Sequence, residues 1–202
     1  MIHFLSVVVV ALSPAVARAE NCSWQFDPAQ VVVGFTAYKT SEKAAVHGRF
    51  LQVGVKGKAK GKGIVDLLSG LSATVNVASL ETDNPARNAT LQEGFFKHLA
   101  QGMKIEGRVD KAKGTDSKGE FVLKLRMNAV EKPVKMSYTA SEAAGFEASG
   151  TIDVLADFHA RESFDGLHAL CNELHKGKDG VSKTWPDVKI SLKAPVAKVC
   201  SE

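Results

Sequence analysis

Residues 72–96 read SATVNVASLETDNPARNATLQEGFF and hold a strand, a polar corner and a helix in immediate succession. In residues 72–77, Ala and Val alternate with Ser, Thr and Asn, which is the two-residue period of a strand with one buried face. Asn84 and Pro85 are suited to the N-cap and the first turn of a helix, so we predict a helix over residues 85–100. Its apolar side is predicted to carry Leu91, Phe95, Phe96 and Leu99.

The same two-residue alternation recurs about eight times along the chain, at the spacing of an antiparallel sandwich or barrel. Strands are predicted in residues 31–37, 46–52, 72–77, 103–109, 121–129, 134–140, 146–158 and 188–194. Two segments depart from this rhythm: the helix over residues 85–100 and residues 163–176, whose apolar residues recur at intervals of three and four. The sequence therefore predicts an all-β protein with two short helices.

Residues 1–19 have the features of a cleaved export signal. Residues 4–12 are apolar, and residues 17–19 (Ala-Arg-Ala) form a small-x-small cleavage site. A retained anchor is the alternative, because only His3 and the amino terminus supply positive charge ahead of the apolar run. After cleavage, residues 20–202 form one domain with no further apolar run near the roughly 18 residues that span a bilayer. No stable membrane insertion is then expected.

The formal net charge is +4, and the charges are interspersed except in residues 56–63, where four lysines alternate with Gly and Ala. We interpret this segment as a solubilising turn rather than a phosphate-binding loop, because no strand-to-helix Walker pattern surrounds it. Nucleic acid is not an expected partner, since aromatic residues are not interleaved with the basic ones.

Three cysteines remain after cleavage, which allows one disulfide and leaves one thiol. Cys22 precedes the first strand and Cys200 follows the last, and these ends lie side by side in a closed antiparallel sheet, so Cys22–Cys200 is the preferred pair. Pairing of Cys171 with Cys200 is the alternative. Cys171 lies at helical spacing from Leu167 and Leu174, which favours a buried apolar role over that of a nucleophile.

The interior of an eight-stranded barrel is either filled by its own side chains or wide enough for one small ligand. Many residues on the inward lines are small: Ala37, Gly48, Ala73, Gly107, Ala129, Ala140, Ala148, Gly150, Ala156 and Ala194. These residues leave space for a ligand unless large side chains opposite them interlock without a void, and the sequence favours neither arrangement. Almost no charged residue points inward, so a ligand would be apolar.

Two motifs resemble the YceI-like family. They are WQFD at residues 24–27 with VHGRF at 46–50, and SLETDNPARN at 79–88 with the Phe pair at 95–96. The resemblance implies an eight-stranded antiparallel, lipocalin-like barrel that is exported to the periplasm and holds a polyisoprenoid or isoprenoid-quinone chain. Residues 160–185 are longer and more polar than the family pattern, so ligand choice is not carried over from it.

We therefore predict a binding or carrier protein that is not an enzyme and has no cofactor beyond the bound lipid. The predicted pore residues are Val33, Phe35, Phe50, Val75, Val77, Phe95, Phe96, Leu123, Leu125, Met127, Met136, Tyr138, Ile152 and Val154. Phe95 and Phe96 are expected to act as a plug or gate at one end of the barrel. The Tyr138 hydroxyl is expected to form a hydrogen bond with a polar head group of the ligand. The segment from Thr82 to Arg87 is interpreted as a structural brace.

The sequence leaves two alternative functions open. An enzyme acting on a bound isoprenoid or quinone needs a polar cluster at the mouth, for which Arg87, Glu93 and His98 are the candidates. A stress-related structural protein would have a filled barrel. His168 and His175 are expected to be exposed rather than metal ligands, because no carboxylate-backed trio accompanies them. A homodimer is left open.

Overall fold

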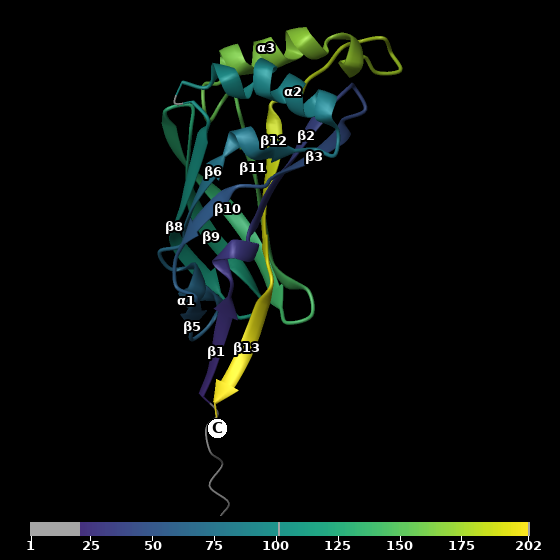
Figure 1. The fold of residues 1–202 in the computed structure, drawn as a ribbon. Coiled ribbons are helices and arrows are strands. Elements are labelled where there is room, and N and C mark those ends of the chain that lie inside the picture. The colour runs from purple at the N-terminus through teal and green to yellow at the C-terminus, as the bar shows by residue number, and fades with distance from the viewer. Residues whose placement is uncertain (1–20, 101, 202) are drawn as a thin grey trace, which may run out of the picture.

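The computed structural model describes residues 21–100 and 102–201, so the predicted signal peptide lies outside the described residues. Ten strands form one strongly curled antiparallel sheet in the described part of the chain, and three more form a smaller sheet (Figure 1). The strands of the large sheet are β2 (Val32–Lys39), β3 (Ala44–Phe50), β4 (Val53–Lys56), β6 (Ser72–Asn76), β7 (Leu80–Glu81), β8 (Lys104–Gly114), β9 (Lys118–Met127), β10 (Val130–Ser141), β11 (Gly145–Asp153) and β12 (Asp187–Ala194).

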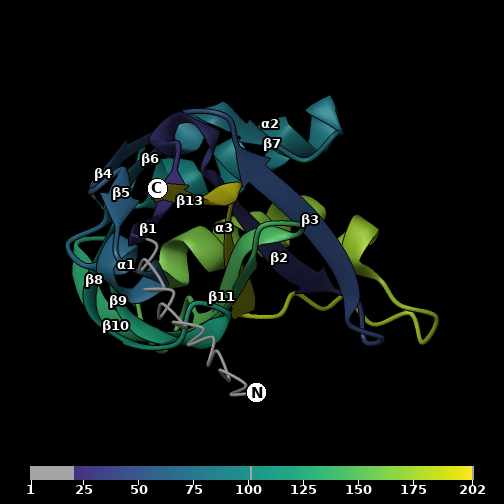
Figure 2. The same cartoon turned by 90° about the horizontal axis from the view of Figure 1, so that it is seen from below.

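The order of the large sheet is β4-β6-β8-β9-β10-β11-β12-β2-β3-β7. Viewed from below in Figure 2, its strands curl around a common interior. All of the pairings are antiparallel, and residues of like parity, such as Phe121, Leu123 and Leu125, are buried on the inner face. The alternation in the sequence therefore predicted correctly which residues face inward on these strands.

The predicted count of eight strands is wrong, because two chain segments are each divided in two. Leu51 and Gln52 separate β3 from β4, and a 3₁₀ turn, η2 (Val77–Ser79), separates β6 from β7. Hydrogen bonds still join the segments across these breaks: the Leu51 N–H donates to the Ser79 carbonyl (3.0 Å) and the Asn76 N–H to the Gln52 carbonyl (3.1 Å). Strands β4 and β6 thus lie at one end of the sheet, and β3 and β7 lie at the other. Each break falls within one stretch of chain, either β3–β4 or β6–β7.

Both predicted helices form, with altered ends. The first is α2 (Pro85–Gly94), followed by the 3₁₀ turn η3 (Phe96–His98). The Asn84 side chain accepts a hydrogen bond from the Arg87 N–H at 3.0 Å, which confirms the predicted N-cap. The second is α3 (Arg161–Cys171), followed by η4 (Glu173–His175). Figure 1 shows α2 and α3 side by side across the upper end of the curled sheet.

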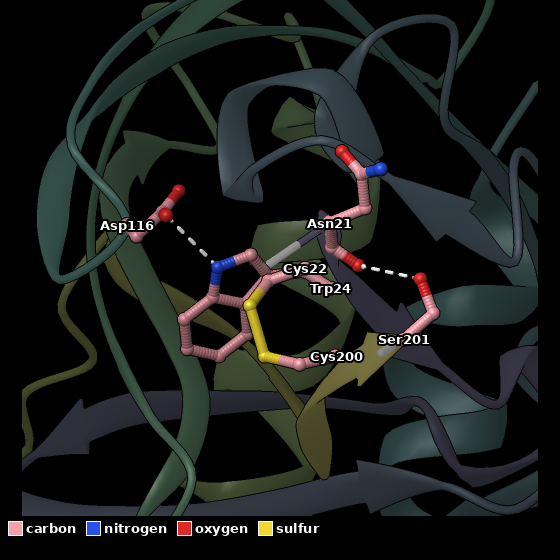
Figure 3. The surroundings of a disulfide bond; sticks show 6 residues. All are labelled: Asn21, Cys22, Trp24, Asp116, Cys200 and Ser201. Carbon is pink, nitrogen blue, oxygen red and sulfur yellow. Dashed lines mark hydrogen bonds between the residues drawn. A yellow bond between two sulfur atoms is a disulfide. The ribbon is translucent and has the colours of Figure 1, made fainter. Parts of the chain in front are cut away.

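The lower end of the molecule is closed by the small sheet, which contains β1 (Asn21–Phe26), β5 (Lys60–Gly61) and β13 (Val196–Ser201). Cys22 and Cys200 face each other in the β1–β13 register and form a disulfide (Figure 3), which confirms the preferred pairing. The short helix α1 (Ile64–Leu68) was not predicted, and it buries Ile64, Leu67 and Leu68 at this end. The small 3₁₀ turn η1 (Pro28–Gln30) follows β1.

Trp24 is buried beside the disulfide, and its indole N–H donates to the Asp116 carboxylate at 2.9 Å (Figure 3). Asp116 also accepts the Ile64 N–H at 3.0 Å, so one carboxylate ties β1, α1 and the β8–β9 turn together. Part of the lysine-rich segment forms β5 and pairs with β1, and Lys58 forms an ion pair with Asp66. No helix within the described residues is both long enough and apolar enough to cross a membrane.

Candidate functional site

A cavity of about 530 Å³ occupies the upper half of the curled sheet, between its inner face and the helices α2 and α3. Its walls are mainly apolar, with aliphatic and aromatic side chains from strands on opposite sides of the interior. The helices contribute Leu91, Phe95, Phe164 and Leu167. A barrel filled throughout, one of the alternatives derived from the sequence, is therefore wrong for the upper half.

Most of the predicted pore residues line this cavity. They are Val33, Phe35, Phe50, Val75, Phe95, Phe96, Leu123, Leu125, Met127, Ile152 and Val154. Of the predicted small residues, Ala37, Ala73 and Gly107 are also on its wall. The predicted plug is aromatic and packed: Phe96 meets Phe50 edge-on at 6.0 Å between ring centroids, and Phe95 at 5.3 Å.

Val77, Met136 and Tyr138 are buried but are not among the cavity residues. Tyr138 lies in the lower half, where it stacks on Phe146 at 5.6 Å and its hydroxyl donates to the Thr115 carbonyl at 2.7 Å. The prediction that this hydroxyl serves a polar head group is therefore wrong. Strand alternation indicates the face of a sheet on which a residue lies, but not its height along the barrel axis.

The lower half is filled by its own side chains. A Cβ atom at Gly150 would lie 2.6 Å from Met136 Sδ, and one at Gly119 would lie 2.7 Å from the Tyr138 hydroxyl. Higher up, the Phe35 ring covers Gly48 in the same way. Small and large residues therefore interlock in the lower half and at Gly48, while Ala73 and Gly107 in the upper half line the cavity.

The corner between β7 and α2 is the brace that the sequence indicated. Thr82 is buried, and both its N–H (2.9 Å) and its hydroxyl (2.6 Å) donate to the Asn88 side-chain carbonyl. Arg87 donates to the Thr82 hydroxyl (3.0 Å) and carbonyl (2.9 Å). Asp83 has a positive φ of 57° and binds Arg49 through both carboxylate oxygens. These contacts fix α2 across the upper end.

The mouth of the cavity lies where η4 meets the end of β2. Leu174 lines the cavity although its exposure is 67%, which identifies this part of the wall as open to solvent. Lys39, His175 and Thr184 line the same region. The Lys39 ammonium donates to the Leu174 carbonyl at 3.3 Å, and Lys39 and Thr184 are joined by a β-bridge.

His168 and His175 are half-buried, so the prediction that they are exposed is wrong. The Nδ1 atoms of both rings lie within hydrogen-bond distance of the Thr184 hydroxyl, at 2.9 and 2.7 Å. Burial, with smaller contributions from the nearby charges of Lys39 and His168, lowers the pKa of His175 to about 4. His175 is therefore neutral at pH 7. Residues 176–185 fold back on α3, which sequence spacing along the helix could not reveal.

Cys171 is a buried free thiol on the cavity wall, as the helical spacing predicted. Burial raises the pKa of its thiol, which disfavours the nucleophilic thiolate. The three residues considered for an enzymatic cluster make separate contacts. Arg87 binds Thr82, Glu93 binds Lys97 at 2.7 Å, and His98 faces Glu162 at 3.5 Å.

The sequence profile of the YceI-like domain matches residues 24–195. This chain belongs to the YceI-like family. The match covers both motifs noted in the sequence and extends from β1 almost to β13. A comparison with curated protein sequences found no match.

Solved structures similar to this YceI-like protein share its fold at low sequence identity. A polyisoprenoid binding domain from Saccharophagus degradans implicated in plant cell wall breakdown has a TM-score of 0.57 at 14% identity, over 85% of this chain and 98% of that one. BcnA of Burkholderia cenocepacia has a TM-score of 0.58 at 14% identity, over 85% and 99%. The YCEI protein of Campylobacter jejuni has a TM-score of 0.52 at 16% identity, over 79% and 86%.

The polar residues at the mouth of the cavity were not predicted from the sequence. A signal for one of them was present: the alternation that places Val33, Phe35 and Ala37 inward continues to Lys39. Thr184 carried no comparable signal, because it lies in a loop with no periodicity. His175 was noted for its spacing from His168, but its burial depends on this loop.

Proposed function

We propose that this YceI-like protein is a periplasmic carrier that holds the apolar chain of an isoprenoid lipid, a polyprenyl lipid or an isoprenoid quinone, in its upper cavity. The supporting observation is the cavity of about 530 Å³ with its mainly apolar wall. This volume lies within the range of roughly 300–1,000 Å³ found for small-molecule sites. The family membership and the polyisoprenoid binding domain among the similar structures favour the same ligand class.

Burial energetics support binding of a long apolar chain. Each isoprene unit offers five carbons, worth about 4 kcal/mol when fully buried at about 0.8 kcal/mol per methylene. Four buried units, worth about 16 kcal/mol, then outweigh an association cost of about 4–15 kcal/mol. The interlocked lower half sets the depth that a chain can reach, and the mouth beside Leu174 leaves room for its other end.

The direct test is to identify what the protein carries. Full-length protein purified from its own host would be examined by native mass spectrometry, and its lipids extracted and analysed. We expect one isoprenoid lipid per chain at a constant ratio. A protein that is consistently empty, or that carries a random mixture of membrane lipids, would contradict the proposal.

A matched pair of variants on β6 tests the location of the ligand. Ala73 lines the cavity, whereas the neighbouring Thr74 is exposed on the other face of the strand. Ala73→Phe should fill part of the cavity and reduce the retained lipid at least tenfold, and Thr74→Phe should leave it unchanged. Equal lipid content in the two variants would place the ligand outside this cavity.

A further inference from the structure

The mouth of the cavity carries positive charge, although the cavity wall is mainly apolar. Lys39 and Arg87 both line the cavity, and its lining residues include no Asp or Glu within the described residues. Arg87 already donates from Nε and one terminal nitrogen to Thr82. Among the described residues, the Lys39 ammonium makes one hydrogen bond, at 3.3 Å to the Leu174 carbonyl.

The charge of each neighbouring lysine has a carboxylate or an aromatic ring as its partner, whereas Lys39 has no carboxylate partner among the described residues. Lys43 pairs with Asp187 at 2.8 Å, and Lys176 pairs with Glu173 at 2.7 Å. Lys183 lies over the Trp185 ring, 3.7 Å from its centroid. Among the described residues, no carboxylate lies within ion-pair distance of Lys39, although this side chain is half-buried. An ammonium group has three N–H donors, so Lys39 retains two for a ligand.

The polar neighbours of Lys39 are held in place by hydrogen bonds. Thr184 stands opposite it in the β-bridge and holds His168 and His175 by its hydroxyl. That hydroxyl has one proton, so it donates to the Nδ1 of one ring and accepts from the Nδ1 of the other. His175 is neutral at pH 7, so it does not add to the formal charge of Lys39. Cys171, also on the wall here, is un-ionised as well.

We propose that Lys39, flanked by His175 and Thr184, is the binding site for an anionic phosphate head on the isoprenoid chain. This inference rests on the proposed function and assigns the ligand's polar end. A phosphate at the mouth receives charge-assisted hydrogen bonds from the free N–H groups of Lys39, and no carboxylate on the wall repels it. A neutral quinone or alcohol head gains much less from the same cation. Lys39 therefore selects polyprenyl phosphates over neutral isoprenoids with the same tail.

The test compares two ligands that differ only in the head group, farnesyl monophosphate and farnesol, by titration calorimetry with the delipidated protein. We expect the wild type to bind the phosphate at least tenfold more tightly than the alcohol. Lys39→Gln should remove this preference by weakening the binding of farnesyl monophosphate, while Lys39→Arg should retain it. Lys135→Gln is the matched control, because Lys135 is exposed on β10 away from the cavity.

The outcomes separate this inference from the proposed function. If the wild type binds both compounds equally, or if the preference survives Lys39→Gln, the phosphate site is overturned and the lipid cavity stands. If neither compound binds, the proposed function fails and the phosphate site fails with it. Unchanged far-ultraviolet circular dichroism and melting temperature of each variant exclude misfolding as the cause.

Discussion

The two halves of the curled sheet are built from the same strands but use them differently. In the lower half, Met136 and Tyr138 occupy the space above the glycines of neighbouring strands, and a disulfide joins β1 to β13 beyond them. In the upper half, Ala73 and Gly107 line a cavity that lies beneath two helices. One set of strands thus supplies a packed core at one end and a binding site at the other.

This difference separates stability from binding. The lower half carries the covalent link and the close packing, both of which stabilise the folded state. The upper half has less internal packing and is held by the hydrogen bonds around Thr82. Changes in the lower half should therefore alter unfolding more than ligand affinity, and changes in the upper half should do the reverse.

The largest expected effect is loss of the disulfide. The two cysteines are 178 positions apart in the sequence, so the disulfide closes a long loop. Cys22→Ser with Cys200→Ser should therefore lower the free energy of unfolding by up to about 5 kcal/mol. Farnesol affinity of the folded variant should change less than twofold, because the disulfide lies outside the cavity. Guanidinium unfolding and calorimetry measure the two quantities. The control Cys171→Ala keeps the disulfide and should lower the free energy of unfolding by about 1 kcal/mol. An equal loss of stability in both variants would contradict the assignment of stability to the lower half.

A pair of glycine substitutions compares the packing of the halves directly. A Cβ at Gly150 meets the Lys135 carbonyl and Met136 Sδ, so Gly150→Ala should destabilise the fold by about 1–3 kcal/mol. A Cβ at Gly107 comes closest to Leu123 Cδ1, at 3.1 Å, beside the cavity. Gly107→Ala should therefore be neutral or stabilise by up to about 1 kcal/mol. Urea unfolding of both variants measures this, and similar losses would mean that the halves are equally packed.

The smallest expected effect is the loss of stability at acidic pH that arises from His175. The pKa of His175 is about 4 in the folded protein and near 6.5 in an unfolded chain, so between these values the unfolded chain binds more protons. Stability should fall as pH decreases from 6.5 to 4, by no more than about 1 kcal/mol, because water screens this half-buried ring. His175→Gln should remove this part of the pH dependence of the melting temperature. An unchanged pH dependence in His175→Gln would rule out His175 as the source.

Much of the fold was predictable because a half-buried strand leaves a direct trace in the sequence. The alternation along β9 and β10 identified the inward residues, and Asn84 with Pro85 identified the start of α2. The division of β6 from β7 was not predictable, since Val77 continues the alternation into a 3₁₀ turn. Helix α1 is too short to show a periodic pattern.

The candidate site was predictable as a face but not as a volume. Val33 and Phe35 on β2 were assigned inward and do line the cavity, while Met136 was assigned inward and fills the lower half. Whether an inward residue borders empty space depends on what stands opposite, which the three-dimensional register decides. The position of Thr184 against His168 and His175 likewise depends on a loop folding back over a helix.

The disulfide also determines how the molecule responds to pulling. Cys22 and Cys200 lie within two residues of the ends of the described chain, so a force applied between residues 21 and 201 is carried by the S–S bond and the few residues outside it. The oxidised protein should extend only slightly under such a load. After reduction, the chain between the cysteines, which are 178 positions apart, can be drawn out to roughly 600 Å at about 3.3–3.6 Å per residue. One covalent bond thus makes the cavity-bearing sheet mechanically independent of tension on its own termini.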